Sequence, residues 1–265
     1  MFGQALPLEP SHQAGIGITG AFEGWFKNPD GTYSLLVGYY NRNQRQEVDI
    51  PVGPNNRMEP GGPDRGQPTH FMPGRSWGAF AVNVPADFGE NKITWTISAN
   101  GVTTVIPLNL KPDWEISPHQ EASVGNTPPV LSFAENGPTV QGPQGMTVER
   151  SAKVGTPLQL TVWASDDARF TSNSGAKPRN MPPPVVLHWT KYRGLGGVVF
   201  AKDRPPAEKI ERPGFAFSGK ATTTATFSEP GEYVLHLQAN DYSGEGGSGF
   251  QCCWSNAQVM VTVAP

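Results

Sequence analysis

Oxygen-bearing side chains gather in two short segments of the C-terminal half of the sequence. Asp166 and Asp167 follow one apolar run, and Asn240, Asp241 and Glu245 follow another. If both runs are strands of one β-sandwich, the two segments become loops at the same end of it. Calcium takes about six to eight oxygen ligands, so it is the leading metal hypothesis for this set. The alternative is that these Asp and Asn residues only cap turns.

A second set of side chains carries the nitrogen and sulfur donors that bind soft metals. Strand alternation predicts that His188 and His236 point outward from neighbouring strands, with Met260 on the same exposed sheet face. His70 and Met72 form a similar pair in the segment THFMPG. Copper and zinc normally need about three or four ligands, and both sets are incomplete. A solvated or partner-facing sheet surface is therefore the competing interpretation.

The two cysteines of the chain, Cys252 and Cys253, are adjacent. They can close a strained ring that would rigidify a binding loop in an exported protein. As alternating strand residues they would instead point to opposite faces, with one thiol buried and the other exposed. The sequence leaves both interpretations open, and it excludes a zinc site built from cysteine alone.

Three tryptophans are candidates for contact with a partner or a sugar ring. Trp163 is out of phase with its apolar neighbours, so it should emerge on the outer face of its sheet. Three threonines are expected beside it, namely Thr222, Thr224 and Thr226. The Trp163 ring has two alternatives, namely burial against the N-terminal half and stacking on a polysaccharide. Trp25 and Trp77 are the other candidates for stacking.

Signatures of catalysis are missing from the sequence. It has no G-x-S-x-G elbow, H-E-x-x-H helix or dinucleotide fingerprint. The segment GLGGVVF lies between two predicted strands, so it offers phosphate no helix N-terminus. Glu23, Asp49, Asp64 and Asp113 have no spacing that indicates a glycosidase pair. We therefore expect a protein that is not an enzyme.

Turn chemistry divides the N-terminal half into strands. Runs 20–27 and 32–40 are joined by Asn-Pro-Asp-Gly, and runs 93–97 and 102–108 by Asn-Gly, both typical of hairpins. Residues 51–68 are rich in Pro and Gly and lack periodicity, which predicts a long surface loop. We interpret residues 1–112 as one β-sandwich.

The C-terminal half has clearer strands. Apolar residues alternate in the runs 158–164, 185–189, 233–237 and 259–263. Residues 113–129 contain several prolines and no strand pattern, which is typical of a semi-rigid linker, and residues 130–265 form a second predicted sandwich. The predicted fold class is all-β, with two tandem sandwiches joined by a Pro-rich linker.

Four segments of the second half follow one another in a familiar order, namely PLQLTVWASDD, VVLHWTKYRGLGGVVF, TTTATFSEPGEYVLHLQANDYSG and NAQVMVTV. Over roughly residues 155–265 the chain thereby resembles the bacterial PKD and K319-like immunoglobulin-like repeat domains, most specifically in Pro-Gly-x-Tyr. The resemblance implies an extracellular sandwich used as a spacer or adhesion module. Trp189 would fill its core and Tyr233 would form a tyrosine corner. The first half has only a generic immunoglobulin-like pattern.

Composition narrows the class of protein further. The chain has 31 Gly, 27 Pro and 16% charged residues among 265, as expected for short strands joined by turns. A net charge of −3 with scattered Lys and Arg argues against binding nucleic acid, and no apolar run is long enough to span a bilayer. We expect an extracellular, periplasmic or cell-surface protein whose export signal is not part of this sequence.

Three functions follow as hypotheses from these observations. The first is a structural or adhesive protein that contacts protein partners or assembles with itself, for which exposed edge strands offer a route. The second is a carbohydrate-binding accessory module, and the third is a metal-binding protein.

Overall fold

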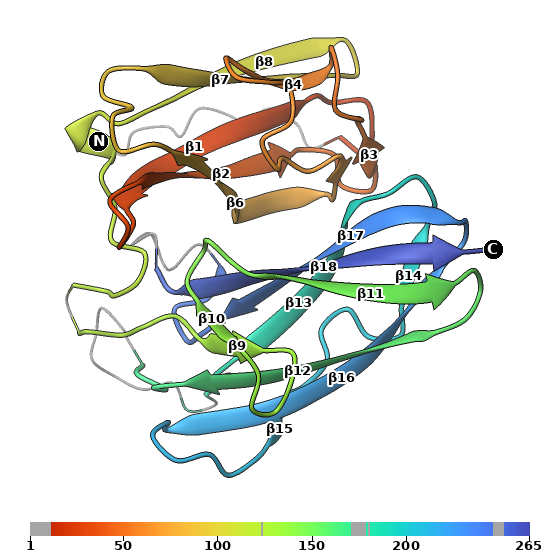
Figure 1. The fold of residues 1–265 in the computed structure, drawn as a ribbon. Coiled ribbons are helices and arrows are strands. Elements are labelled where there is room, and N and C mark those ends of the chain that lie inside the picture. The colour runs from red at the N-terminus through yellow and green to blue at the C-terminus, as the bar shows by residue number, and fades with distance from the viewer. Residues whose placement is uncertain (1–11, 123, 171–178, 180, 246–251) are drawn as a thin grey trace, which may run out of the picture.

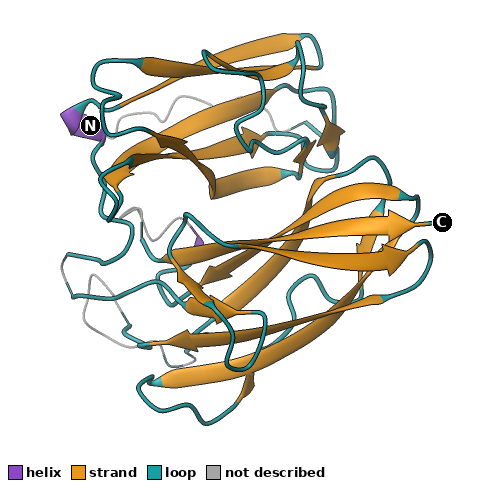
Figure 2. Ribbon diagram, in the orientation of Figure 1, coloured by secondary structure: helices purple, strands orange, loops and turns teal. Residues whose placement is uncertain are grey.

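The computed structural model in Figure 1 describes residues 12–122, 124–170, 179, 181–245 and 252–265. The strands form two groups of sheets, one above the other in this view. Helical structure in the described part is limited to short 3-10 turns such as η1 (Pro112–Trp114), and strands dominate the ribbon in Figure 2. The predicted all-β fold is confirmed. No helix of the described residues is long and apolar enough to cross a membrane.

The first group of sheets contains β1 to β8. One antiparallel sheet has the order β1-β2-β6, a second has the order β4-β7-β8, and β3 pairs with β5. The bounds are β1 (Ile18–Lys27), β2 (Tyr33–Asn41), β3 (Val48–Asp49), β4 (Asn56–Glu59), β5 (His70–Phe71), β6 (Gly74–Val84), β7 (Lys92–Ala99) and β8 (Val102–Asn109). Trp95 is fully buried among the apolar side chains that these strands enclose.

The second group is a sandwich of two larger sheets. One has the order β10-β9-β12-β16-β14, with β15 also paired to β16, and the other has the order β11-β18-β17-β13. The bounds are β9 (Val130–Ser132), β10 (Thr139–Gln141), β11 (Thr147–Lys153), β12 (Leu158–Asp166), β13 (Val186–Arg193), β14 (Val198–Phe200), β15 (Glu208–Lys209), β16 (Phe217–Phe227), β17 (Gly231–Asn240) and β18 (Trp254–Ala264). Their inner faces bury a hydrophobic cluster of their own.

The predicted hairpins and alternating strands are present. β1 pairs with β2 and β7 with β8, both antiparallel. The four alternating runs of the second half lie in β12, β13, β17 and β18. The prediction that residues 51–68 form only a surface loop is wrong, because β4 lies within them and pairs with β7. Met58 of β4 is fully buried, a core contribution that Pro and Gly on either side conceal in the sequence.

Two features implied by the family resemblance are visible in the second sandwich. Trp189 is 2% exposed and lies in the core between the sheets. The hydroxyl of Tyr233 donates to the carbonyl of Glu229 at 2.9 Å, four residues upstream, as in a tyrosine corner. The Gly196 N–H donates back to the same hydroxyl at 3.1 Å. This residue therefore ties the turn after β13 to the start of β17.

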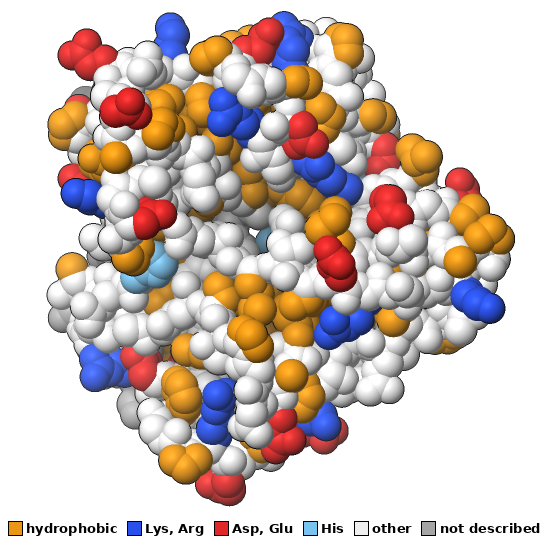
Figure 3. Space-filling model, viewed as in Figure 1, with side chains coloured by type: hydrophobic (Ala, Val, Ile, Leu, Met, Phe, Trp, Pro, Cys, Tyr) orange, Lys and Arg blue, Asp and Glu red, His pale blue; other side chains and the backbone are white. Residues whose placement is uncertain are grey.

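The β11-β18-β17-β13 sheet faces the first group of sheets (Figure 1). Tyr192 and Val234 of this sheet pack against the apolar cluster of the first group. The predicted linker also docks on the first group, because the Ile116 N–H donates to the carbonyl of Trp25 at 2.9 Å. On the face shown in Figure 3, charged side chains of both signs are scattered, with no large patch of one sign.

Candidate functional site

The contact between the β11-β18-β17-β13 sheet and the first group of sheets is called the junction below. Arg193 on β13 makes paired hydrogen bonds with Asp64, at 2.9 and 2.8 Å. Asn256 on β18 is 4% exposed, and its Nδ2 donates to the carbonyl of Gly78 on β6 at 2.6 Å. Hydrogen bonds of this kind are directional, and the paired Arg–carboxylate contact adds geometric specificity. The junction therefore holds the two groups in one orientation.

A buried ion pair lies on the first side of the junction. Glu23 on β1 is 4% exposed, hydrogen-bonds to Arg75 and accepts the Gly78 N–H at 2.6 Å. Arg75 also donates to the carbonyl of Tyr39 at 2.9 Å, and its guanidinium lies 4.1 Å from the Trp77 ring centroid. Burial raises the pKa of Glu23 above its usual value, and the charge of Arg75 opposes that rise. The additional hydrogen bonds of Glu23 and Arg75 offset the cost of burying this ion pair.

A cavity of about 210 Å³ lies within the junction. It is lined by Met72 and Arg75 from the first group of sheets and by His188 and His236 from the second. His236 is 5% exposed, and its Nε2 has no hydrogen-bond partner. The pKa of His236 is lowered from 6.5 to about 4, chiefly by burial and in smaller part by His188. His236 is therefore uncharged at neutral pH.

Arg204 closes one wall of this junction cavity. Its Nη2 lies 3.2 Å from Nδ1 of His188 and 2.9 Å from a carboxylate oxygen of Glu245. Burial lowers the pKa of His188, and the charge of Arg204 adds to the effect. Glu245 was predicted to join the calcium ligands, but it lies in this wall.

Met260 does not line the junction cavity with the two histidines, and it lines a separate surface pocket. It shares the outer face of the sheet with His236, as predicted, but it is 43% exposed and lies opposite Val234 in the strand register. The prediction that this face is exposed at His236 is wrong, because the first group of sheets covers it. The methionine that lines the same cavity as the two histidines is Met72.

His70 holds Met72 from behind the cavity wall. Nδ1 of His70 lies 2.8 Å from Asp49, and Nε2 lies 3.3 Å from the sulfur of Met72 and 3.3 Å from Glu47. His70 is 4% exposed and its two ring nitrogens are both engaged. It therefore acts as a support for Met72 in this structure.

Two carboxylates are buried at the end of the second sandwich where β12 and β17 finish. Asp166 is 2% exposed and Asp241 is 3% exposed. Nδ2 of Asn126 donates to Asp241 at 2.6 Å, while Oδ1 of Asn126 and Oδ1 of Asp166 are buried without a partner. The pKa of Asp166 is raised from 3.8 to about 7, chiefly by burial and in smaller part by the charge of Asp241. These three residues are called the acidic end below.

The neighbouring charges do not neutralise the acidic end. Arg169 pairs with Asp167 at 3.8 Å and donates to the carbonyl of Gly125 at 2.9 Å. Among the described residues, no Lys, Arg or His forms an ion pair with Asp166 or Asp241. Burial also raises the pKa of Asp241, and the charge of Asp167 adds to that rise. The acidic end thus holds two buried carboxyl groups that no cation among the described residues pairs with.

The other predicted calcium ligands are placed differently. Asp167 accepts the N–H and the hydroxyl of Thr127 at 3.2 and 3.0 Å, so it caps a loop beside the acidic end. Asn240 points to the junction face, where its Nδ2 donates to Gln238 at 3.4 Å. No three His, Cys, Asp or Glu side chains in the part of the chain that is described are arranged to hold a metal. A metal site here must therefore include other donors.

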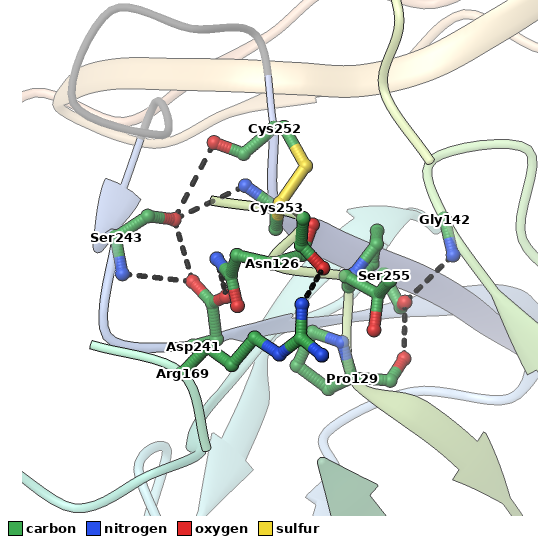
Figure 4. The surroundings of a disulfide bond; sticks show 12 residues. Asn126, Pro129, Gly142, Arg169, Asp241, Ser243, Cys252, Cys253 and Ser255 are labelled. Atoms are coloured by element: carbon green, nitrogen blue, oxygen red, sulfur yellow. Dashed lines mark hydrogen bonds between the residues drawn. A yellow bond between two sulfur atoms is a disulfide. The ribbon is translucent and has the colours of Figure 1, made fainter. Parts of the chain in front are cut away.

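A disulfide joins Cys252 and Cys253 next to the acidic end (Figure 4). The two residues are 1% and 0% exposed, so of the two interpretations left open by the sequence the structure has the closed ring and not one exposed thiol. The hydroxyl of Ser243 donates to Asp241 at 2.5 Å and accepts the Cys253 N–H at 3.1 Å. Ser243 thus connects the disulfide directly to the acidic end.

The tryptophans give the carbohydrate hypothesis little support. Trp25 is 9% exposed and donates to the carbonyl of Lys111 at 2.8 Å, and Arg75 covers the ring of Trp77. Trp163 lies on the sheet that faces away from the first group, so the expectation that it is buried against the N-terminal half is wrong (Figure 1). Lys220 lies 5.1 Å from the ring centroid of Trp163.

The predicted threonines lie on the strand beside Trp163. Thr222 and Thr224 line an open groove of about 530 Å³ on this outer face, while Thr226 pairs with Val199 of β14. Thr222 lies opposite Thr161, two positions along the strand from the register partner of Trp163. The strand alternation therefore placed this face correctly.

Sequence reasoning missed two groups of site residues. Asn126 lies in the segment interpreted as a linker, and a lone Asn among prolines gives no metal-binding signal. Glu23 was noticed only as an unassigned carboxylate, and its partner Arg75 lies 52 residues away in the chain. No local pattern connects such distant residues.

No protein-family model and no curated protein matches this chain. Domains 4 and 5 of the S-layer protein SbsC are 13% identical to it, cover 94% of this chain and 98% of their own, and have a TM-score of 0.24. The D00-D0 domain of intimin is 15% identical, with coverages of 92% and 99% and a TM-score of 0.25. The adhesin InvE of Yersinia pseudotuberculosis is 13% identical, with coverages of 92% and 58% and a TM-score of 0.24. At these scores the likenesses identify no family for the chain.

Proposed function

We propose that this chain is a non-catalytic structural or adhesive protein of the cell surface or extracellular space that makes contacts with other protein chains. The observation that carries the proposal is the junction. Tandem domains move relative to one another unless their interface is extensive, and here Arg193–Asp64 and Asn256–Gly78 tie the sandwiches together through directional hydrogen bonds. A fixed pair of sandwiches suits a spacer or adhesion element, because it sets the distance and direction between its two ends.

The outer strands offer surfaces for partners. β8 and β14 lie at the edges of their sheets. Val102 and Val105 on β8 are 47% and 59% exposed, and Val199 on β14 is 71% exposed. An edge strand has unpaired backbone groups that readily add a strand from another chain. These edges are the proposed routes to a partner or to self-assembly.

The native protein is expected to react with a membrane-impermeant label on intact producing cells and to be extracted in an assembly larger than its own 28.5 kDa. Light scattering of the purified chain at high concentration should show self-association that Val105→Lys and Val199→Lys reduce. Thr222→Lys, on an outer sheet face, is the matched control and should leave the size unchanged. A strictly monomeric profile together with an unlabelled protein on cells would contradict the proposal.

We further propose that the acidic end binds one calcium ion. The ion would stabilise the second sandwich where Asn126, just before β9, meets the ends of β12 and β17. The oxygen donors on hand are the carboxylates of Asp166 and Asp241 and the side-chain amide of Asn126, the set that calcium prefers. Two neighbouring carboxylates removed from water are costly without a positive charge. The unpartnered Oδ1 atoms of Asp166 and Asn126 support the same conclusion.

Calcium is expected to raise the melting temperature of chelator-treated protein by roughly 5–10 °C at about a hundredfold excess over its dissociation constant. Asp166→Asn should abolish this response and should itself stabilise the calcium-free protein at neutral pH, because it removes a buried negative charge. Asp87→Asn, at an exposed turn, is the control and should respond like the unmodified chain. An absent calcium response in the unmodified chain, or an intact one in Asp166→Asn, would overturn the site.

A further inference from the structure

A gap interrupts the strand pairing along one edge of β16. β14 pairs with β16 at residues 225–227, and β15 pairs with it at residues 219–220. Between these pairings, residues 202–207 leave the edge, because the carbonyl of Asp203 accepts the N–H of Trp189 on the opposite sheet at 2.8 Å. The open groove of about 530 Å³ on the outer side of the second sandwich lies at this gap.

Thr222 presents its backbone N–H and C=O to this gap. The carbonyls of Ser218 and Thr224 accept hydrogen bonds from the two segments that flank the gap. Backbone groups alternate sides along a regular strand, and β16 pairs with β12 without a register shift, so Thr222 faces the same side. Extending the β15 register places Pro206 opposite Thr222, and proline has no N–H to donate. No described group of the protein hydrogen-bonds to this donor or this acceptor.

The side chains around the gap carry an excess of positive charge. The hydroxyl of Thr223 accepts the Lys202 N–H at 3.1 Å and donates to the Lys202 carbonyl at 2.7 Å, which fixes this wall of the groove. Lys220 also lines the groove, and its Nζ lies 5.1 Å from the ring centroid of Trp163. Of the described residues that line the groove, Glu208 is the one carboxylate, so the lining favours an anionic ligand.

A sugar ring matches the donor and the acceptor at Thr222. Hydroxyl groups both donate and accept, so one ring hydroxyl can accept the N–H while its neighbour donates to the C=O. The volume of the groove lies in the usual range of small-ligand sites, about 300–1,000 Å³. An extended peptide fits less well, because an added strand needs a free run of edge. β14 and β15 occupy the edge on both sides of Thr222.

We propose that this groove binds an acidic polysaccharide. Two adjacent hydroxyls of one sugar ring bond to the backbone of Thr222, and the carboxylate of a uronic acid unit meets Lys202 or Lys220 in a charge-assisted hydrogen bond. Backbone groups and cations recognise the sugar here, so no tryptophan ring has to stack on it. The groove shares no lining residue with the acidic end or with the exposed valines of β8 and β14, so the site does not depend on the functions proposed above.

Amide hydrogen exchange of the full chain, followed by NMR, tests the backbone contact. The Thr222 N–H should exchange faster in the free protein than the N–H of Thr223, which faces β12 in the strand register. Adding oligogalacturonate or hyaluronan fragments should shift the Thr222 amide signal and slow its exchange. A Thr222 amide that is already protected in the free protein, or that none of these oligosaccharides affects, would overturn the proposal.

Calorimetric titration with the same oligosaccharides tests the lysines. Lys202→Glu and Lys220→Glu should each bind roughly tenfold more weakly, the effect of losing one charge-assisted contact. Lys209→Glu is the matched control, because Lys209 is an exposed lysine of β15 that does not line the groove. It should stay within about twofold of the unmodified chain, since an exposed charge outside the contact is largely screened. Oligogalacturonate with its carboxyl groups reduced should bind the unmodified chain more weakly and still shift the Thr222 amide.

Three results of the titrations would contradict the site. They are that no uronate oligosaccharide binds, that both lining variants bind as well as Lys209→Glu, or that a threonine- and valine-rich strand peptide shifts the Thr222 amide where the sugars do not. Chelator-treated buffer excludes calcium bridges between uronates and the protein. The calcium response of Lys220→Glu should match that of the unmodified chain, so failure of the sugar site leaves the calcium site and the adhesive role to their own tests.

Discussion

Gly78→Ala is expected to lower the free energy of unfolding by about 3 kcal/mol or more, the combined cost of overpacking and of a disfavoured backbone angle. Gly78 has φ = 46°, and a Cβ at this position would lie 2.2 Å from Cζ2 of Trp254. Trp254 is 1% exposed and belongs to β18, on the other side of the junction. The measurement is chemical denaturation monitored by tryptophan fluorescence and by circular dichroism.

The backbone at Gly78 cannot shift to relieve this clash without losing other contacts. Its N–H donates to Glu23 at 2.6 Å, and its carbonyl accepts from Asn256 at 2.6 Å. Gly31→Ala is the matched control, since Gly31 has φ = 87° and no atom within 4 Å of an added Cβ. It should cost only the backbone strain, about 1–2 kcal/mol. Equal losses in the two variants would show that close packing across the junction contributes nothing.

The elements of this fold were predictable because their signals are local. Alternating apolar residues identify β12, β17 and β18, and turn residues identify the hairpins β1-β2 and β7-β8. The signal failed at β4, where the strand is four residues long and flanked by Pro and Gly. There the pairing with β7 and the burial of Met58 determine the structure, and neither is a property of the segment alone.

The candidate sites were predictable only in part. Placing Asp166 and Asp241 at one end of a sandwich requires only strand order, and the two residues lie buried where β12 and β17 finish. The sequence pointed to Met260 as the methionine near the two histidines, but Met72 lines their cavity. Which methionine does so depends on how one sandwich packs on the other. That arrangement is determined by long-range pairs such as Arg193–Asp64, whose members are 129 residues apart in the chain. Single-sequence patterns contain no information about such pairs.

Arg75→Leu is expected to destabilise the protein by about 3–5 kcal/mol at neutral pH, because it leaves the buried carboxylate of Glu23 without its cation. Glu23 is 4% exposed, and the charge of Arg75 is the largest effect that lowers its pKa. Adding Glu23→Gln should recover much of the loss, since the neutral amide can still accept the Gly78 N–H. Arg57→Leu is the control: its ion pair with Glu59 is exposed and should contribute under about 1 kcal/mol.

The pH dependence of Arg75→Leu distinguishes an unpaired buried charge from a simple loss of packing. Without Arg75, burial raises the pKa of Glu23 in the folded state further above its usual 4.5, while the unfolded state keeps the usual value. The folded state then binds a proton more tightly, so the destabilisation is greatest at alkaline pH and decreases as the pH falls toward 4.5. Unfolding should therefore be measured at pH values near 5 and near 8, with the double variant alongside. A loss of the same size at both pH values would mean that Arg75 supports the junction through its contacts with Trp77 and Tyr39, and that the charge of Glu23 is balanced without it.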